Sequence, residues 1–300
     1  MRLPAFLIIL SASLLTSLQI GSGARAGDTP DAPAYKLEAG PFKVQTIKAL
    51  ILEDAKRKKV LQLRITYPND GESFPLIVFS HGLGATKDHY QPVITLSASH
   101  GDVCIQPDHS DSRAFGGKHG PEVVGNPVVF KDRASRPLDI SFILDSLDDI
   151  ETKVPSLKGK VDLAKIGVAG HSYGAFITQL LAGAAAMTPD GVRSQSFHGK
   201  RIGSVIVISG MGTGEIFTKQ TFESVHKPML MLTGTKDRTG CRGLSAPWVK
   251  EVYDYTPPGD KQFVGGVSQM FLVRAAQSPR GSSTLSEVCY SIGPKGARPI

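Results

Sequence analysis

The sequence predicts an α/β fold, in which a mostly parallel central sheet has helices on both faces and an antiparallel hairpin at its start. One observation is a series of short, continuous apolar runs, the pattern of strands that are covered on both faces. Another is that helical patterns separate most of these runs, as expected of parallel strands joined by helices. We expect the strands at residues 75–79, 103–105, 165–169, 202–209, 228–234 and 260–264.

The hairpin is expected within residues 44–67. Residues 61–67 alternate between apolar and polar side chains, which is the period of a half-buried strand. A strand-like run at 44–52 precedes them, and the charged stretch 54–59 between the two runs indicates a turn.

Three segments are expected to be helical: residues 90–100, 137–150 and 175–182. Pro137 suits the first turn of the second helix. Apolar residues recur along this helix at helical spacing, and the acidic residues lie off the apolar face. We therefore predict a solvated acidic face, and no metal site, at Asp139, Asp145, Asp148 and Asp149.

Gly170-His171-Ser172-Tyr173-Gly174 has the Gly-x-Ser-x-Gly pattern of a sharp turn between a strand and a helix. An apolar run precedes the motif and a helical pattern follows it, so the context fits the pattern. The turn presents the serine hydroxyl at the carboxyl edge of the sheet. It also directs the amide of Tyr173 and the helix N-terminus to the place where an oxyanion would form. Ser172 is therefore the candidate nucleophile.

Two further candidates follow expected strands. The segment His81 to Gly84 follows the strand at 75–79, and its glycines let the backbone approach a substrate and donate an amide, which we expect to be that of Leu83. Asp237 follows the strand at 228–234 and is placed to orient a histidine. The alternatives are a plain strand-to-helix turn at His81 and a turn or helix-capping role for Asp237.

Together these segments resemble the α/β-hydrolase superfamily, and in particular the secreted esterases similar to platelet-activating factor acetylhydrolase, chlorophyllase and dienelactone hydrolase. The resemblance covers roughly residues 42–266. It rests on five motifs in order, which are Phe74–Gly82, Ser99–His109, Arg136–Asp139, Gly170–Gly174 and Leu232–Asp237. A serine in the turn, in place of the cysteine of dienelactone hydrolases, indicates ester hydrolysis.

The resemblance implies an α/β-hydrolase fold and acyl transfer to water from a small-molecule carboxylic ester, without a cofactor. It implies that Ser172 is the nucleophile, that Asp237 is the triad acid, and that the amides of Leu83 and Tyr173 form the oxyanion hole. His81 and His171 belong to the motifs as packing and hydrogen-bonding residues, and neither is then the catalytic base.

The resemblance fails at the base. In relatives, Pro-Pro-Gly-Asp-Lys is followed by a strand and then by Gly-x-x-His, whereas here Pro257–Lys261 is followed by Gly266–Gln269. Gln269 therefore occupies the expected position of the base, and no histidine follows His226. A glutamine does not accept the serine proton and return it to the leaving group. We expect the chain as written to be nearly inactive.

The C-terminal residues 271–300 depart from the family as well. Relatives close with an amphipathic helix, whereas this stretch is rich in glycine, serine and proline and predicts an irregular tail. One account is a natural inactive enzyme. The other, which we favour slightly, is a change of reading frame near Gln269, because the pattern holds to Gly266 and then fails abruptly.

Residues 1–26 have the features of a secretory signal peptide, with Arg2 before an apolar stretch and Ala24–Ala26 as a small-x-small cleavage site. An uncleaved membrane anchor is the alternative, although polar residues interrupt the apolar stretch. We expect a secreted or periplasmic protein with an extended lead-in at 27–41, a hydrolase domain at 42–270 and no later membrane span.

The composition of the 300 residues, 41% hydrophobic and 20% charged, is that of a globular domain. The formal net charge is +7 without a basic stripe interleaved with aromatic residues, so nucleic acid is not an expected partner. Cys104 is expected to be buried. Cys241 and Cys289 could pair in an oxidising compartment, which the sequence does not establish. No cysteine–histidine spacing indicates zinc.

Residues 109–134 form the longest irregular stretch, and we expect them to form one wall of a substrate cleft. Phe115 and His119 are candidate lining residues, with simple loop packing as the equal alternative. A second class of function is a catalytically inactive hydrolase fold that binds a lipid, a polymer or a protein partner in the same cleft. A structural envelope protein has no positive feature in its favour.

Overall fold

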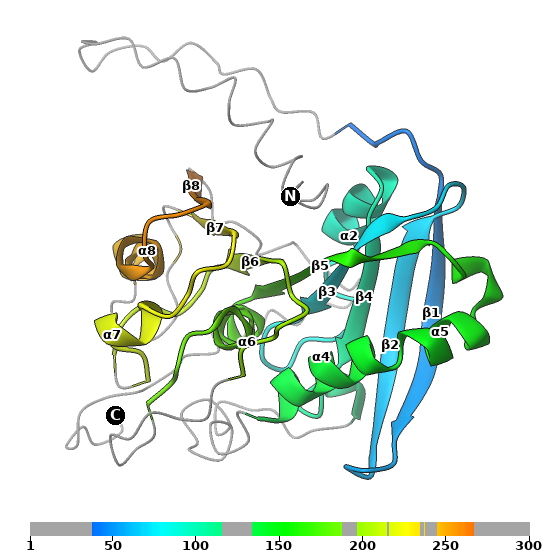
Figure 1. The fold of residues 1–300 in the computed structure, drawn as a ribbon, viewed down its shortest axis with the longest axis horizontal. Coiled ribbons are helices and arrows are strands. Elements are labelled where there is room, and N and C mark those ends of the chain that lie inside the picture. The colour runs from blue at the N-terminus through cyan, green and yellow to red at the C-terminus, as the bar shows by residue number, and fades with distance from the viewer. Residues whose placement is uncertain are drawn as a thin grey trace, which may run out of the picture.

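A computed structural model describes residues 38–115, 134–187, 197–214, 216–234, 237 and 245–266. Within them, eight strands form one sheet in the order β1-β2-β4-β3-β5-β6-β7-β8 (Figure 1). β2 is antiparallel to β1 and β4, and every other neighbouring pair is parallel. The strands are β1 Val44–Asp54, β2 Lys59–Pro68, β3 Phe74–Ser80, β4 Val103–Asp108, β5 Val161–His171, β6 Ser204–Ile208, β7 Met229–Gly234 and β8 Lys261–Gly266. The predicted fold class is confirmed.

The hairpin forms as predicted. β1 and β2 pair in a register that joins Asp54 to Lys59 across the charged turn. On β2 the inward side chains Leu61, Leu63 and Ile65 are fully buried, as the period of two requires.

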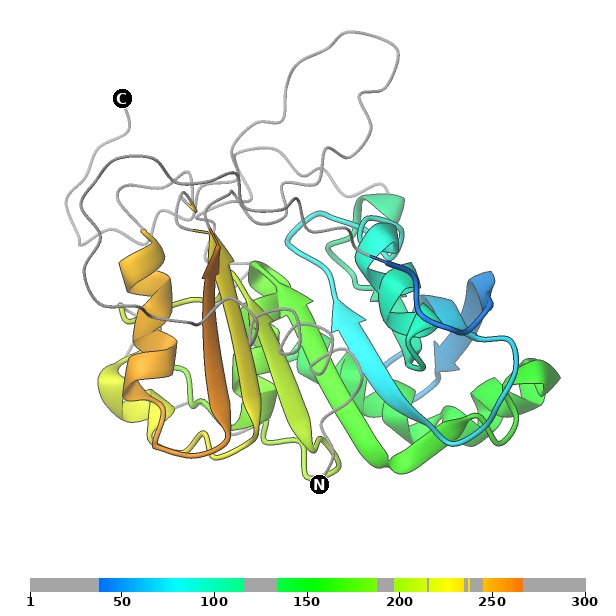
Figure 2. The same cartoon turned by 90° about the horizontal axis from the view of Figure 1, so that it is seen from above.

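Helices cover both faces of the sheet (Figures 1 and 2). Helix α2, Gln91–Ser99, packs on β2 and β4 and contributes Ile94 to the core of one face. The other face carries α4, Ser135–Asp145, α5, Leu147–Lys153, and α6, Tyr173–Ala182. The remaining helical elements are α7 Lys219–Phe222, α8 Ala246–Tyr255 and the 3₁₀ turns Arg113–Phe115 and Pro155–Leu157.

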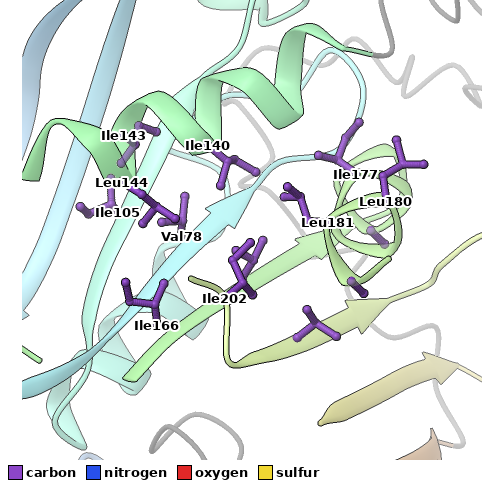
Figure 3. Close-up of a cluster of buried hydrophobic side chains, with 14 of the residues drawn as sticks. Val78, Ile105, Ile140, Ile143, Leu144, Ile166, Ile177, Leu180, Leu181 and Ile202 are labelled. Carbon is purple, nitrogen blue, oxygen red and sulfur yellow. The ribbon is translucent and has the colours of Figure 1, made fainter. Parts of the chain in front are cut away.

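The larger core lies between the sheet and helices α4 and α6. Figure 3 shows Val78 and Ile105 of the paired strands β3 and β4 facing Ile140 and Ile143 of α4. All four side chains are fully buried. This packing attaches α4 to the strands whose carboxyl ends carry the candidate catalytic segments.

The helix predicted at 137–150 differs from the structure in two respects. It is interrupted at Ser146, which leaves the helical conformation with φ −103° and ψ 14°, consistent with the low helix propensity of serine beside Asp145. The prediction of a solvated face was also wrong for Asp139, which is fully buried because groups from the hairpin and β4 surround it.

Cys104 is a buried free thiol within the α2 side of the core, as predicted. Of the helices in the described ranges, none combines the length and the apolar character that a membrane span requires.

Removing buried side-chain volume at the α4 contact will destabilise the fold. We expect Ile143→Ala to lower the free energy of unfolding by about 2–5 kcal/mol, because it deletes a fully buried branched side chain. Urea unfolding followed by circular dichroism measures the change. Leu138→Ala on the same helix is the control, since Leu138 is 42% exposed and its change is expected to stay within about 0.5 kcal/mol. Equal losses in the two variants would contradict this description of the core.

Candidate active site

Ser172 occupies the sharp turn between β5 and α6. Its backbone has φ 53° and ψ −115°, a conformation that non-glycine residues rarely adopt. The flanking glycines are required by space: a Cβ at Gly170 would lie 2.3 Å from the Gly174 carbonyl oxygen, and a Cβ at Gly174 would lie 2.0 Å from that of Ser80. The start of α6 therefore lies directly against the end of β3.

The segment after β3 is held by hydrogen bonds along its backbone. The amide of Gly82 donates to the Tyr90 hydroxyl at 3.2 Å, and the amide of Gly84 donates to Asp111 Oδ2 at 3.2 Å. The amide of Ala85 donates to the Gly82 carbonyl at 3.1 Å. Within the described part of the chain, the amide of Leu83 has no hydrogen-bond partner. We call residues 81–85 the oxyanion loop, after the role that the sequence predicts for the amide of Leu83.

The oxyanion loop and the Ser172 turn are brought together by strand pairing and by Arg136. Ser80 pairs with Gly170 in the register of β3 and β5. The Arg136 guanidinium donates to the His81 carbonyl at 2.5 Å, and its carbon lies 4.6 Å from the centre of the Tyr173 ring. The same buried arginine thus contacts the ring of Tyr173 and the backbone just before Leu83, the two residues predicted to supply the oxyanion amides.

Asp237 lies just after β7, as predicted, and two hydroxyl groups bind its carboxylate. Ser209 Oγ donates to Oδ2 at 2.5 Å and Thr233 Oγ1 donates to the same oxygen at 3.1 Å. Ser209 follows β6 and has φ 51°, which lies in the left-handed region like that of Ser172. The Ser172 amide donates to the carbonyl of Ile208, the residue before Ser209. Ser209 therefore connects the Asp237 carboxylate to β6, the strand that lies beside the Ser172 turn.

A buried polar chain runs behind the oxyanion loop. His109 Nδ1 donates to Asp139 Oδ2 at 2.8 Å, and His109 Nε2 accepts a hydrogen bond from Ser80 Oγ at 3.0 Å. Lys59 Nζ lies 2.7 Å from both oxygens of Asp139, and Arg57 donates to Oδ1 at 2.8 Å. His109, Ser80 and Asp139 are fully buried, which separates this serine–histidine–aspartate chain from any substrate.

Burial sets the protonation of the enclosed histidines. Burial, and then the positive charge of Arg136, hold the pKa of His81 well below its usual value. The same two causes lower the pKa of His109 by more than Asp139 raises it. Burial lowers the pKa of His171 to about 4 against the opposing charge of Asp237. All three rings are therefore neutral at neutral pH.

Two carboxylates in this region remain ionised. Burial raises the pKa of Asp111, but the charge and hydrogen bonds of Arg136 outweigh it and hold the pKa far below the usual range. Burial likewise raises the pKa of Asp139, and the hydrogen bond from His109 together with the charge of Lys59 lowers it below its ordinary value. These carboxylates thus provide fixed negative charge for the buried cations.

The hydroxyl of Ser172 has no hydrogen-bond partner among the described residues, so none of the histidines in those ranges is placed as its base. Gln269 and His119 lie outside the described residues, as do Cys241, Cys289, the predicted signal peptide and the predicted tail. Phe115 is 42% exposed at the edge of the described range. In the same ranges, no group of three or more histidine, cysteine, aspartate or glutamate residues is arranged to hold a metal ion.

Comparison with known proteins finds a family match in the first part of the chain. A family model described as platelet-activating factor acetylhydrolase, isoform II matches residues 42–119. The platelet-activating factor acetylhydrolase of Canis lupus familiaris is 32% identical over 136 residues, which cover 35% of this chain and 31% of that protein. The same enzyme of Bos taurus is 30% identical over 136 residues, with the same two coverages. The alignments with these relatives therefore span about a third of each of them. The residues that the family model matches include the oxyanion loop but not Ser172.

A solved structure of a protein assigned as a dienelactone hydrolase from Klebsiella pneumoniae superposes with a TM-score of 0.50 at 14% identity, over 74% of this chain and 85% of that one. The chain has the α/β-hydrolase fold. At this identity the structural likeness concerns the fold alone. Together with the acetylhydrolase matches, it confirms the predicted resemblance of the chain to α/β-hydrolase-type esterases.

In this α/β-hydrolase fold, sequence reasoning missed the residues that support the site. Asp111, Arg136 and Ser209 bind the oxyanion loop or Asp237, and His109 connects the loop to Asp139. Arg136 and His109 belonged to motifs recognised in the sequence, but their partners come from distant strands. For Asp111 and Arg136, the signal that the sequence offers is a charged residue close to a strand end or a helix start, within otherwise apolar surroundings.

The neutral histidines predict a loss of stability in mild acid. Their folded pKa values lie below the unfolded value of about 6.5, so the unfolded chain binds protons that the folded chain does not. The free energy of unfolding is therefore expected to be constant above about pH 7 and to fall below it by up to about 1.4 kcal/mol per pH unit for each histidine.

Urea unfolding between about pH 7.5 and pH 5 measures this slope. His171→Gln is expected to reduce it, whereas His89→Gln is the control because His89 is exposed. A stability that does not change down to about pH 5 would contradict the assignment of neutral, buried histidines.

Proposed function

We propose that the chain carries the site of a serine carboxylic ester hydrolase that works through an acyl-enzyme. Ser172 Oγ forms a bond to the ester carbonyl carbon, and the bond from that carbon to the leaving alkoxide breaks. The serine proton passes through a base to the departing alcohol. Water then attacks the acyl-enzyme and releases the carboxylic acid and the free serine. No cofactor takes part.

The observation that carries the proposal is the position of Ser172 beside the Leu83 amide, which has no hydrogen-bond partner within the described ranges. The left-handed backbone at Ser172 and the close contact of Gly174 with Ser80 place the turn against the oxyanion loop. In that loop the amides on both sides of Leu83 are occupied, and the Leu83 amide remains to donate. Together with the amide of Tyr173 at the start of α6, it would stabilise the oxyanion of the tetrahedral intermediate.

Asp237 would serve as the triad acid. Ser209 and Thr233 both donate to its Oδ2, which holds the carboxylate in one orientation. The same contacts fix the direction of the other carboxylate oxygen, Oδ1. That oxygen would accept a hydrogen bond from the Nδ1–H of a histidine. The strained backbone of Ser209 is consistent with this demand for orientation.

The proposal assigns no side chain as the catalytic base. Gln269 stands where the family has its histidine, and no described side chain bonds the Ser172 hydroxyl. In subtilisin, loss of the catalytic histidine costs on the order of a million-fold in turnover, while the oxyanion hole and binding retain roughly 10³–10⁴-fold over water. The proposed activity of the chain as written is therefore strongly reduced.

The substrate proposed is a small-molecule ester, since the relatives that match the chain are named for removing an acetyl group. Secretion or export to a periplasm is proposed from residues 1–26 alone. The second candidate function is a catalytically inactive fold that binds a lipid, polymer or protein partner in the cleft. The observation that favours it is that the Ser172 hydroxyl has no hydrogen-bond partner among the residues that the structure describes.

Hydrolysis of an activated short-chain ester decides between the two functions. We expect weak turnover by the full chain, none above background in Ser172→Ala, and a gain of at least about 10²-fold in Gln269→His, because a positioned base contributes that much or more. Thr178→Ser, which keeps its hydroxyl on α6 and bonds the Gly174 carbonyl, is the control for changes beside the turn.

Strong turnover by the chain as written that disappears in Ser172→Ala would show that another group acts as the base and that the role assigned to Gln269 is wrong. Equal turnover in the chain as written and in Ser172→Ala would contradict the nucleophile itself. Sequencing the coding DNA around codons 266–272 tests the frame change separately. If none of the alternative reading frames contains a histidine there, the frame change is excluded.

A further inference from the structure

We propose that Arg136 is a positioning residue of the oxyanion hole, which acts with His81 to lock the Gly82–Leu83 peptide so that its N–H faces the ester. The inference rests on the proposed function and extends it to residues outside the triad.

The carbonyl of that peptide is held on the inner side. Gly82 O lies 2.7 Å from His81 Nδ1, and it also accepts from the amide of Ala85 at 3.1 Å and from Arg136 Nη2 at 3.4 Å. His81 and Arg136 are buried, so these donors lie within the protein. Three donors around one oxygen leave the carbonyl little freedom to rotate outward.

The described chain has no cis peptide bond, so the N–H of Leu83 points opposite to the Gly82 carbonyl. With the carbonyl directed at Arg136 and His81, the N–H is directed away from them. The neighbouring amides of Gly82 and Gly84 are already bonded to Tyr90 and Asp111. Leu83 therefore supplies the amide that the loop keeps available for a ligand.

The tautomer of His81 follows from the nearest neighbour of each ring nitrogen. For Nδ1 this is Gly82 O at 2.7 Å, which is closer than Arg136 Nη2 at 3.4 Å. A carbonyl oxygen donates no proton, so Nδ1 carries the hydrogen that bonds Gly82. Nε2 is then the bare nitrogen, and it accepts from the backbone amide of His109 at 3.2 Å. The side chain of His109 is in turn held by Asp139. The direction of the loop peptide is thus tied to a buried carboxylate on α4.

Arg136 is itself fixed at every side. It is bonded to Asp111 by Nε at 2.8 Å and by Nη2 at 2.5 Å, and Nη1 donates to Ser80 Oγ at 3.1 Å. Its guanidinium also stacks over Tyr173, the residue that would supply the second oxyanion amide. A lysine would keep the charge but not this planar set of donors.

The tautomer of His81 tests the geometry without requiring turnover. In the full chain labelled with ¹⁵N-histidine, long-range ¹H–¹⁵N spectra are expected to show His81 protonated at Nδ1 and bare at Nε2 at neutral pH, with His81→Gln identifying the signal. An Nε2–H tautomer, or a rapidly exchanging mixture, would overturn the proposal.

The kinetic test compares Arg136→Lys with Arg201→Lys in the Gln269→His chain. Arg201 is an exposed arginine that bonds Asp145 on α4, the helix that carries Arg136. Its variant is expected to leave turnover unchanged. Arg136→Lys is expected to lower kcat about 10²-fold with little change in KM, the effect of losing an oxyanion donor.

An unchanged kcat in folded Arg136→Lys, or a loss confined to KM, would overturn the positioning role. If no form of the protein hydrolyses the ester, the proposed function fails by itself and the tautomer still decides the direction of the peptide. The tautomer is measured on the unaltered chain, so it also decides the matter if Arg136→Lys does not fold.

Discussion

Asp139 lies fully buried between α4 and the β1–β2 hairpin, where Lys59, Arg57 and His109 all bond its carboxylate. A buried carboxylate without partners is costly, and removing one partner of such a group leaves uncompensated charge in the interior. The hairpin, the end of β4 and the start of α4 must therefore meet at one point. That requirement gives the antiparallel hairpin a role in the site although it carries no candidate catalytic residue.

The orientation set at Asp139 extends to the candidate active site through hydrogen bonds of defined direction. His109 transmits it to the end of β3, and Arg136 adds a second set of contacts to the same segment. These hydrogen bonds restrain the network, because displacing His109 or Arg136 would leave a buried group unpaired. The turn at Ser172 is rigid for a different reason, since backbone of neighbouring segments fills the space at Gly174. Two stiff elements thus meet at the carboxyl edge of the sheet.

Much of the fold could be predicted from the sequence because its signals are local. Apolar runs, a period of two and the Gly-x-Ser-x-Gly pattern each concern neighbouring residues, and they gave the strand positions, the hairpin and the turn at Ser172. Burial of Asp139 could not be predicted in the same way, because helical periodicity describes one helix and its partners come from the hairpin and β4. The contacts of Arg136 and the strained backbone of Ser209 depend on distant segments for the same reason.

The central claim is that Ser172 is a nucleophile placed at an oxyanion site that the fold forms in advance. Covalent labelling of the full chain with an alkyl fluorophosphonate, located by peptide mass spectrometry, tests it most directly. The account predicts one adduct, on Ser172, which forms slowly in the chain as written, faster in Gln269→His and not at all in Ser172→Ala. An adduct on another serine, or labelling that persists in Ser172→Ala, would contradict it.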